Sequence, residues 1–138
     1  MNTSPNTEHS IPTFLINAFP AHLSAEVVLV SSNTAPISHA SDPGSEIRIV
    51  AESLLIPTRI YQQVDEQVFK KLPRRAGILY SCILTRHSDG YVRQRHLARI
   101  FDENQLWIAP FVIQLASEYV VEILQDIEKN FNRLDPAT

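Results

Sequence analysis

The spacing of apolar residues between Pro73 and Phe131 constrains this chain more than any other feature, because it repeats every three to four residues. An α-helix brings residues at that spacing onto one face, so the pattern predicts amphipathic helices that pack on a core. Interruptions at residues 86–90, at residues 102–104 and near Ser117 divide the pattern into four short helices. We therefore expect a mainly α fold with two antiparallel helix pairs.

Each expected helix carries one apolar stripe, and burial of these side chains at about 1.5–3 kcal/mol each would drive folding. Pro110 falls in the first turn of the third helix, where its missing N–H leaves no hydrogen bond unmade. A further helix, residues 64–72, is expected to end at Pro73. The four stripes are Ala76, Leu79, Cys82 and Ile83; Val92, Leu97, Ile100 and Phe101; Ile108, Phe111, Val112 and Leu115; and Val120, Ile123, Leu124, Ile127 and Phe131.

The N-terminal part of the chain reads differently, since six of the nine prolines precede residue 58. Two short apolar runs, Phe14–Phe19 and Val27–Val30, suit either a strand or a packed turn. Residues 31–45 contain almost nothing that could anchor a core and predict a linker, while alternation after residue 46 predicts short β-strands in a hairpin or edge ribbon. The expected organisation is an irregular or partly ordered segment over 1–45 and a helical domain over 46–138.

Composition points to a soluble globular protein, with 138 residues, 44% hydrophobic residues and a net charge of −3. Cys82 stands alone in an apolar stretch, which predicts a buried thiol and fits a reducing cytoplasm. The polar residues 1–10 do not resemble a secretory signal, and apolar runs fall short of the roughly 18 residues that span a bilayer. We expect a cytoplasmic protein without a membrane segment.

Charge is distributed unevenly along the sequence. Residues 1–69 carry seven acids and two bases, residues 70–99 one acid and eight bases, and residues 100–138 seven acids and two bases, giving balances of −5, +7 and −5. The basic block could bind phosphates or an acidic partner. The alternative, which we favour, is that the basic helices pack beside acidic ones and the charges neutralise one another. The acidic stripe Glu118, Glu122 and Asp126 could then pair with Arg95 and Arg99.

The turn between the first two expected helices, Ser88–Arg93 (SDGYVR), resembles the turn between the helices of HEAT-type repeats. By residue type, Ser88 or Asp89 can accept hydrogen bonds from the free amides of the second helix, and Gly90 keeps the turn tight. The resemblance implies an antiparallel helical hairpin in which Asp89 caps the second helix and Arg93 is a partly buried hydrogen-bonding partner. The segments RHSDGYVRQ and PFVIQLASEYVVEI, within residues 46–131, are also similar to small uncharacterised bacterial proteins. This second resemblance implies a bacterial or phage origin and no particular reaction.

Two helix pairs leave apolar faces at both ends, because repeat proteins normally stack three or more units. The N-terminal segment is the cover we expect first, and a second copy of the chain the next.

Catalytic motifs are not recognisable in the sequence, so we expect no enzyme and no cofactor. His87, Asp89 and His96 lie within ten residues but do not share the helical spacing of paired metal ligands, which predicts a turn histidine and a surface histidine and no metal site. Cys82 lacks a partner geometry that would make it a nucleophile.

A surface for binding another protein is the function that the sequence favours. Tyr91, Trp107 and Tyr119 lie near turns, where they could be exposed anchors, although Trp107 could equally pack over the 102–104 turn. Arg95 and Arg99 lie one turn apart on the outer face of the second helix and complete the expected partner-binding set. The chain would then be an adaptor, or an immunity or antitoxin protein. Nucleic-acid binding by residues 70–99 is the alternative.

Overall fold

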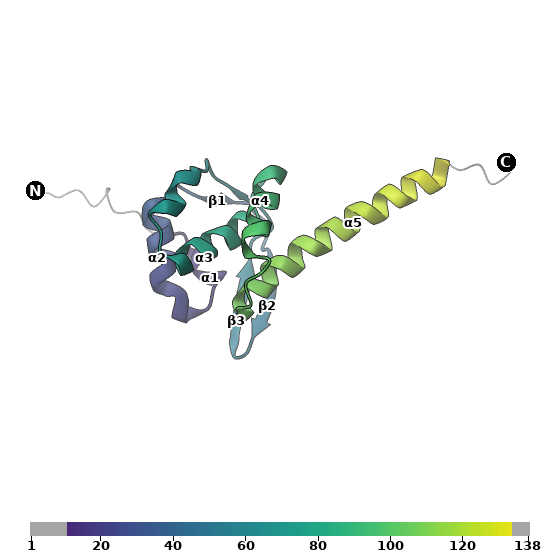
Figure 1. The fold of residues 1–138 in the computed structure, drawn as a ribbon. Helices are drawn as coiled ribbons and strands as arrows, with labels where there is room; N and C mark the ends of the chain where they lie inside the picture. The colour runs from purple at the N-terminus through teal and green to yellow at the C-terminus, as the bar shows by residue number, and fades with distance from the viewer. Residues whose placement is uncertain (1–10, 134–138) are drawn as a thin grey trace, which may run out of the picture.

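The computed structural model describes residues 11–133, with side chains as far as Asn130. The expectation about residues 1–10 therefore lies outside the described residues. The fold is mainly α-helical, with two small β-sheets (Figure 1). Its elements in chain order are α1 (Thr13–Asn17), η2 (Ala21–Leu23), α2 (Ser24–Asn33), β1 (Ser38–His39), β2 (Ser45–Ile49), β3 (Glu52–Ile56), β4 (Ile60–Tyr61), η3 (Glu66–Lys70), α3 (Arg74–Leu84), α4 (Gly90–Ile100), η4 (Leu106–Ile108) and α5 (Ala109–Arg133).

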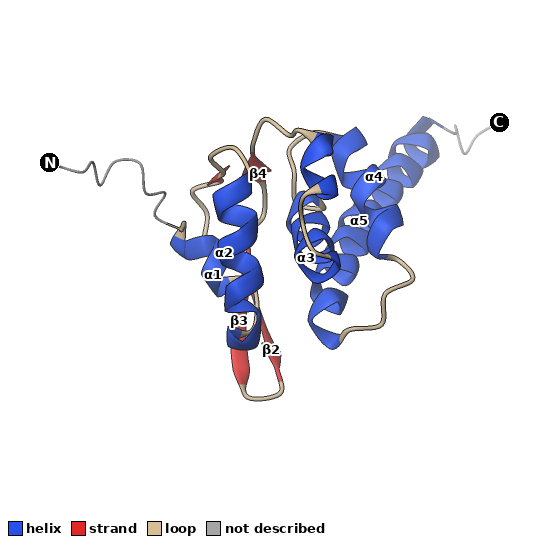
Figure 2. Cartoon of the chain, turned by 60° about the vertical axis from the view of Figure 1, so that its left-hand side comes forward, coloured by secondary structure: helices blue, strands red, loops and turns tan. Residues whose placement is uncertain are grey.

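Helix α3 is the centre of the core. Figure 2 shows α1 and α2 on one side of it and α4 and α5 on the other. Because neighbours surround it, α3 buries polar as well as apolar positions, and Ser81 is as inaccessible as Leu79. The thiol of Cys82 is buried and free, as predicted, and burial raises its pKa.

The N-terminal segment supplies the expected cover over this helix. The two apolar runs that could have been strands are helices instead, and Leu15, Phe19, Leu23, Val27 and Val30 belong to the same buried cluster as α3. The part of the N-terminal segment that the structure describes, residues 11–45, therefore shares one core with the helices that follow. Residues 31–45 include the end of α2 and the short strand β1 as well as loop.

The predicted β-hairpin is confirmed as β2 paired with β3, with Ile47 opposite Leu54. Its tight turn places Val50 at a φ of 56°, a region that β-branched residues rarely adopt. The other sheet pairs β1 with β4, and β4 also bonds to the α3–α4 turn, where Ile60 N–H donates to the Arg86 carbonyl at 2.9 Å. The expected helix over 64–72 is a 3₁₀ helix, η3, of five residues.

The first helix pair has the expected turn. Asp89 is the N-cap of α4, and its carboxylate accepts a hydrogen bond from the Tyr91 N–H at 2.9 Å. The partly buried Arg93 donates to the carbonyls of His87 and Ser88, at 2.8 and 3.1 Å, and so closes its own turn. The predicted inward position of Phe101 is wrong, since this side chain is 66% exposed at the end of α4.

The second helix pair is absent from the described residues, because α5 is one continuous helix of 25 residues. Ser117, which we expected near a break, instead donates its hydroxyl to the Ile113 carbonyl one turn back at 2.9 Å. Pro110 lies in the first turn, as predicted. The helix leaves the rest of the molecule after its first half and projects from it (Figure 1).

Burial divides α5 into two halves. Phe111 and Leu115 are buried as predicted, as is Ile108 in the preceding η4, and Phe111 is stacked on Phe19 at 5.2 Å between ring centroids. The stripe we assigned to the core further along faces solvent instead, and every residue from 121 to 130 is exposed. The exposed fractions are 53% for Val120, 56% for Ile123, 58% for Leu124 and 54% for Ile127.

Candidate interaction surface

A buried ion pair fixes α5 to the rest of the molecule. Arg86, at the end of α3, is wholly buried and donates from Nη1 and Nη2 to the two carboxylate oxygens of Glu118, at 3.1 and 2.8 Å. Its remaining donors reach the carbonyls of Pro57 and Thr58, at 3.0 and 2.7 Å. Arg59 adds a second cation, 2.9 Å from the same carboxylate. Three separate segments therefore meet at Glu118.

The charges at this junction are mutually dependent. Burial alone would raise the pKa of Glu118, but the hydrogen bonds and charges of Arg86 and Arg59 outweigh it and hold the pKa below its usual value. The carboxylate is thus ionised at neutral pH, as a buried guanidinium requires.

Sequence reasoning missed this pair. It placed Arg86 at a helix break and assigned Glu118 to an acidic stripe that would answer Arg95 and Arg99. Arg86 continues the buried spacing of Leu79, Cys82 and Ile83, which is the signal that could have shown a cation pointing inward.

Most of the solvent-facing apolar residues of α5 form one stripe, and Val121, which is 51% exposed, lies outside it. Ile113, Ala116, Val120, Ile123 and Ile127 recur at alternating steps of three and four residues, with Leu124 beside them. We call this set of six residues the α5 stripe. At about 100° per residue it lies on the opposite side of the helix from Phe111 and Glu118, which face the body. One helix thus carries two apolar faces, one of them uncovered.

The rest of the projecting half is acidic. Its charged residues through Asn130 are Glu122, Asp126, Glu128 and Lys129. Within the described part of the chain, Leu106–Asn130 is long and apolar enough to cross a membrane, but length and composition alone carry little weight. A span would place the Glu118–Arg86 ion pair near its centre, and helices that lie on membranes carry Lys and Arg on their polar face instead.

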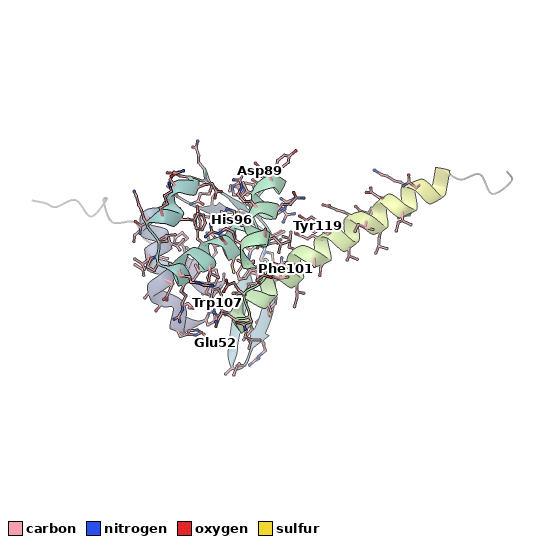
Figure 3. All side chains as sticks on the ribbon, viewed as in Figure 1. Glu52, Asp89, His96, Phe101, Trp107 and Tyr119 are labelled. Carbon is pink, nitrogen blue, oxygen red and sulfur yellow. The ribbon has the colours of Figure 1, made fainter. Side chains whose placement is uncertain are left out.

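The aromatic residues expected at a binding surface do not gather in one place. Tyr91 is 82% exposed at the start of α4, and Tyr119 is half-buried on α5. The expectation that Trp107 is an exposed anchor is wrong. Its side chain is only 5% exposed and lies edge-on to Phe19, 6.0 Å away between ring centroids. Figure 3 shows Trp107 within the body and Tyr119 at the base of the projecting helix. Trp107 is therefore a core residue that cannot anchor a partner.

Most arginines of the basic segment, residues 70–99, contact other groups within the chain. Arg95 pairs with Glu66 at 3.1 Å, and the Arg99 guanidinium lies 4.1 Å from the Phe69 ring centre. Arg74 and Arg75 pair with Glu103 and Glu26, at 2.8 and 4.0 Å. These contacts and the Arg86–Glu118 pair support the neutralised alternative, although Arg95 pairs with Glu66 and not with an acid of residues 118–126.

His96, expected at the surface, is wholly buried between α3 and α4. Burial lowers its pKa, so the ring is neutral at pH 7; Nε2–H then donates to Glu66 at 3.0 Å and Nδ1 accepts from the Ser81 hydroxyl at 2.9 Å. The order serine, histidine, carboxylate is that of a nucleophile with its base.

Ser81 does not act as a nucleophile, because a substrate cannot reach its hydroxyl and the amides beside it are not free to stabilise an oxyanion. The hydroxyl belongs to a wholly buried residue in the interior of α3, where the neighbouring amides are already bonded within the helix. The Ser81–His96–Glu66 hydrogen bonds therefore have a structural role and hold α3, α4 and η3 together. In residues 11–133, no cluster of three or more His, Cys, Asp or Glu side chains could hold a metal ion.

No family model, curated protein or solved structure matches this chain.

Proposed function

We propose that this chain is a non-catalytic protein-interaction module that binds its partner through the α5 stripe. The observation that carries the proposal is the exposure of Ile113, Val120, Ile123, Leu124 and Ile127, each more than half accessible on one side of a projecting helix. Monomeric soluble proteins seldom leave a contiguous apolar patch of more than a few hundred Å² uncovered. An adaptor and an immunity or antitoxin protein would both require such a surface.

Helix stability supports the same proposal. Residues 121–130 are all exposed, so they gain little packing from the rest of residues 11–133, and isolated helices shorter than about 12–15 residues are marginal in water. A partner that covers the stripe would supply the missing packing. The half that carries Glu118 is fixed to the body, so the projecting half is presented in a defined direction.

The finer parts of the proposal rest on the sequence. The α3–α4 hairpin as a HEAT-like unit is supported by the Asp89 cap and the partly buried Arg93. A bacterial or phage origin rests on resemblance, and a cytoplasmic location is supported by the single free thiol. The pairing of Arg74, Arg75 and Arg95 with acidic side chains counts against the alternative function, nucleic-acid binding. A gel shift at low salt tests that alternative.

The experiment is a comparison of two variants that place the same charge on the projecting half. Ile123→Glu puts a carboxylate on the stripe, and Gln125→Glu puts one on the opposite side; both positions are exposed, so neither change disturbs the core. Tagged proteins are recovered from their native host and the bound proteins, including other copies of the chain, are identified by mass spectrometry. Loss of bound protein from the Ile123→Glu variant alone supports the proposal. Equal recovery from both variants refutes it.

A further inference from the structure

We propose that the α5 stripe binds a second copy of this chain, in an antiparallel pair of α5 helices related by a two-fold axis near residues 120–123. This inference rests on the proposed function and names the partner. A second copy of the chain is also one of the two covers that the sequence suggested for an apolar helix face.

The spacing of the stripe specifies a helical partner. Ile113, Ala116, Val120, Ile123 and Ile127 occupy the first and fourth positions of successive heptads. That 3.5-residue period keeps a narrow seam facing another helix, whose side chains fill the holes between neighbouring stripe residues. A membrane surface would require a broader apolar face with basic margins, and α5 has acidic ones.

The area is sufficient for a dimer of modest affinity. Five large side chains, each more than half exposed, present roughly 100 Å² apiece, so their complete burial in two copies would remove about 1,000 Å² from solvent, near the lower limit for specific interfaces. The body does not obstruct the approach, because Phe111 and Glu118 hold it on the opposite side of α5.

The margins of the seam are compatible with an identical partner. The flanking positions are Tyr119 and Asp126 on one side and Ser117 and Leu124 on the other, so a single charge borders the seam in each copy. In the antiparallel register Asp126 faces the partner's Tyr119, whose hydroxyl can donate to the carboxylate. Like charges do not meet across these positions.

The sizes of the seam residues favour the antiparallel direction. It places Val120 against the partner's Ile123 and the small Ala116 against the partner's Ile127, which keeps these layers similar in volume, and it leaves Ile113 opposite the partner's Asn130 at each end of the seam. A parallel pair would place Ala116 against the partner's Ala116. It would also bring the acidic ends, with Glu122 and Glu128, together in both copies.

Sedimentation equilibrium of the full chain over a range of concentrations tests the inference. We expect the wild-type protein and the Gln125→Glu control to approach twice the 15.6 kDa chain mass. Ile123→Glu should raise the dimer dissociation constant by ~100-fold or more, because two carboxylates enter the apolar seam. A wild-type protein that remains at the mass of one chain up to millimolar concentration overturns the inference.

Cysteine variants test the direction, and Cys82 is too deeply buried to interfere. When Val120→Cys and Ile123→Cys proteins are mixed and oxidised, an antiparallel pair gives the mixed disulfide, whereas a parallel pair gives each variant linked to itself. The second result overturns the proposed arrangement.

The outcomes also separate this inference from the proposed function. A monomeric wild type that loses a bound protein only in the Ile123→Glu variant refutes self-association and leaves the binding role standing. Binding of wild type to phosphatidylserine vesicles, without dimers, likewise overturns self-association. If Ile123→Glu changes neither mass nor bound proteins, both proposals fail.

Discussion

Replacing Glu118 by glutamine should destabilise the protein strongly, because it leaves a buried guanidinium without its counter-ion. Arg86 is 0% exposed, and in that variant it keeps only neutral acceptors: the carbonyls of Pro57 and Thr58 and the amide oxygen at position 118. Breaking one side of a buried ion pair costs about 3–5 kcal/mol, and the lower end applies here because the side chain of Glu118 is 26% exposed. We therefore expect a loss of about 3 kcal/mol, a large share of the ~5–15 kcal/mol typical of a domain.

The assay is urea unfolding at one protein concentration in the Ile123→Glu background, so that self-association does not contribute. The matched control is Glu103→Gln, which removes a carboxylate from Arg74, a residue whose side chain is 72% exposed. That surface pair should contribute no more than ~1 kcal/mol. Replacing Arg86 by methionine together with Glu118 by leucine should recover much of the loss, since neither charge then remains buried. Equal losses for Glu118→Gln and Glu103→Gln would refute the anchoring role.

Three further predictions follow from burial, titration and backbone strain. Phe111→Ala should cost ~3–5 kcal/mol, whereas Leu124→Ala should change monomer stability by less than ~0.5 kcal/mol, as measured by urea unfolding; similar losses would contradict the division of α5. Burial in the folded state lowers the pKa of His96 from 6.5, so its contribution to the free energy of unfolding is complete above pH 6.5 and decreases as the pH falls below that value. The lowered pKa values of Glu66 and Glu118 predict a further loss of stability below pH 4.5. Thermal unfolding from pH 8 to 3 should show both phases, and His96→Gln should flatten the first. Val50→Gly should raise stability by about 0.5–1 kcal/mol, because glycine accepts the positive φ of the hairpin turn; a lowered melting temperature would exclude strain there.

Features that depend on neighbours in the sequence could be predicted. The Asp89 cap, the β2–β3 hairpin and the inward face of α3 all follow from spacings of two to four residues. These short-range patterns are dictated by turn chemistry and by the helical or strand period.

Features that depend on contacts between distant parts of the chain could not be predicted from the sequence. The partnership of Arg86 with Glu118 joins residues 32 apart, and nothing in the local sequence of either residue specifies the other. Periodicity placed Val120 and Ile123 on an apolar face but did not say what covers it. Ser117 can cap a helix or bond within one, and only the packing of α5 on the body selects the second.

Amide hydrogen exchange over residues 120–130, measured as the concentration of the full chain is raised, tests most directly whether the projecting half of α5 is an interaction surface. A lone exposed helix should exchange rapidly, whereas a helix packed on a partner should be protected. We expect protection to increase with concentration in the wild type and in the Gln125→Glu variant, and not in Ile123→Glu. Rapid exchange at every concentration, unchanged when proteins from the native host are added, would contradict the account.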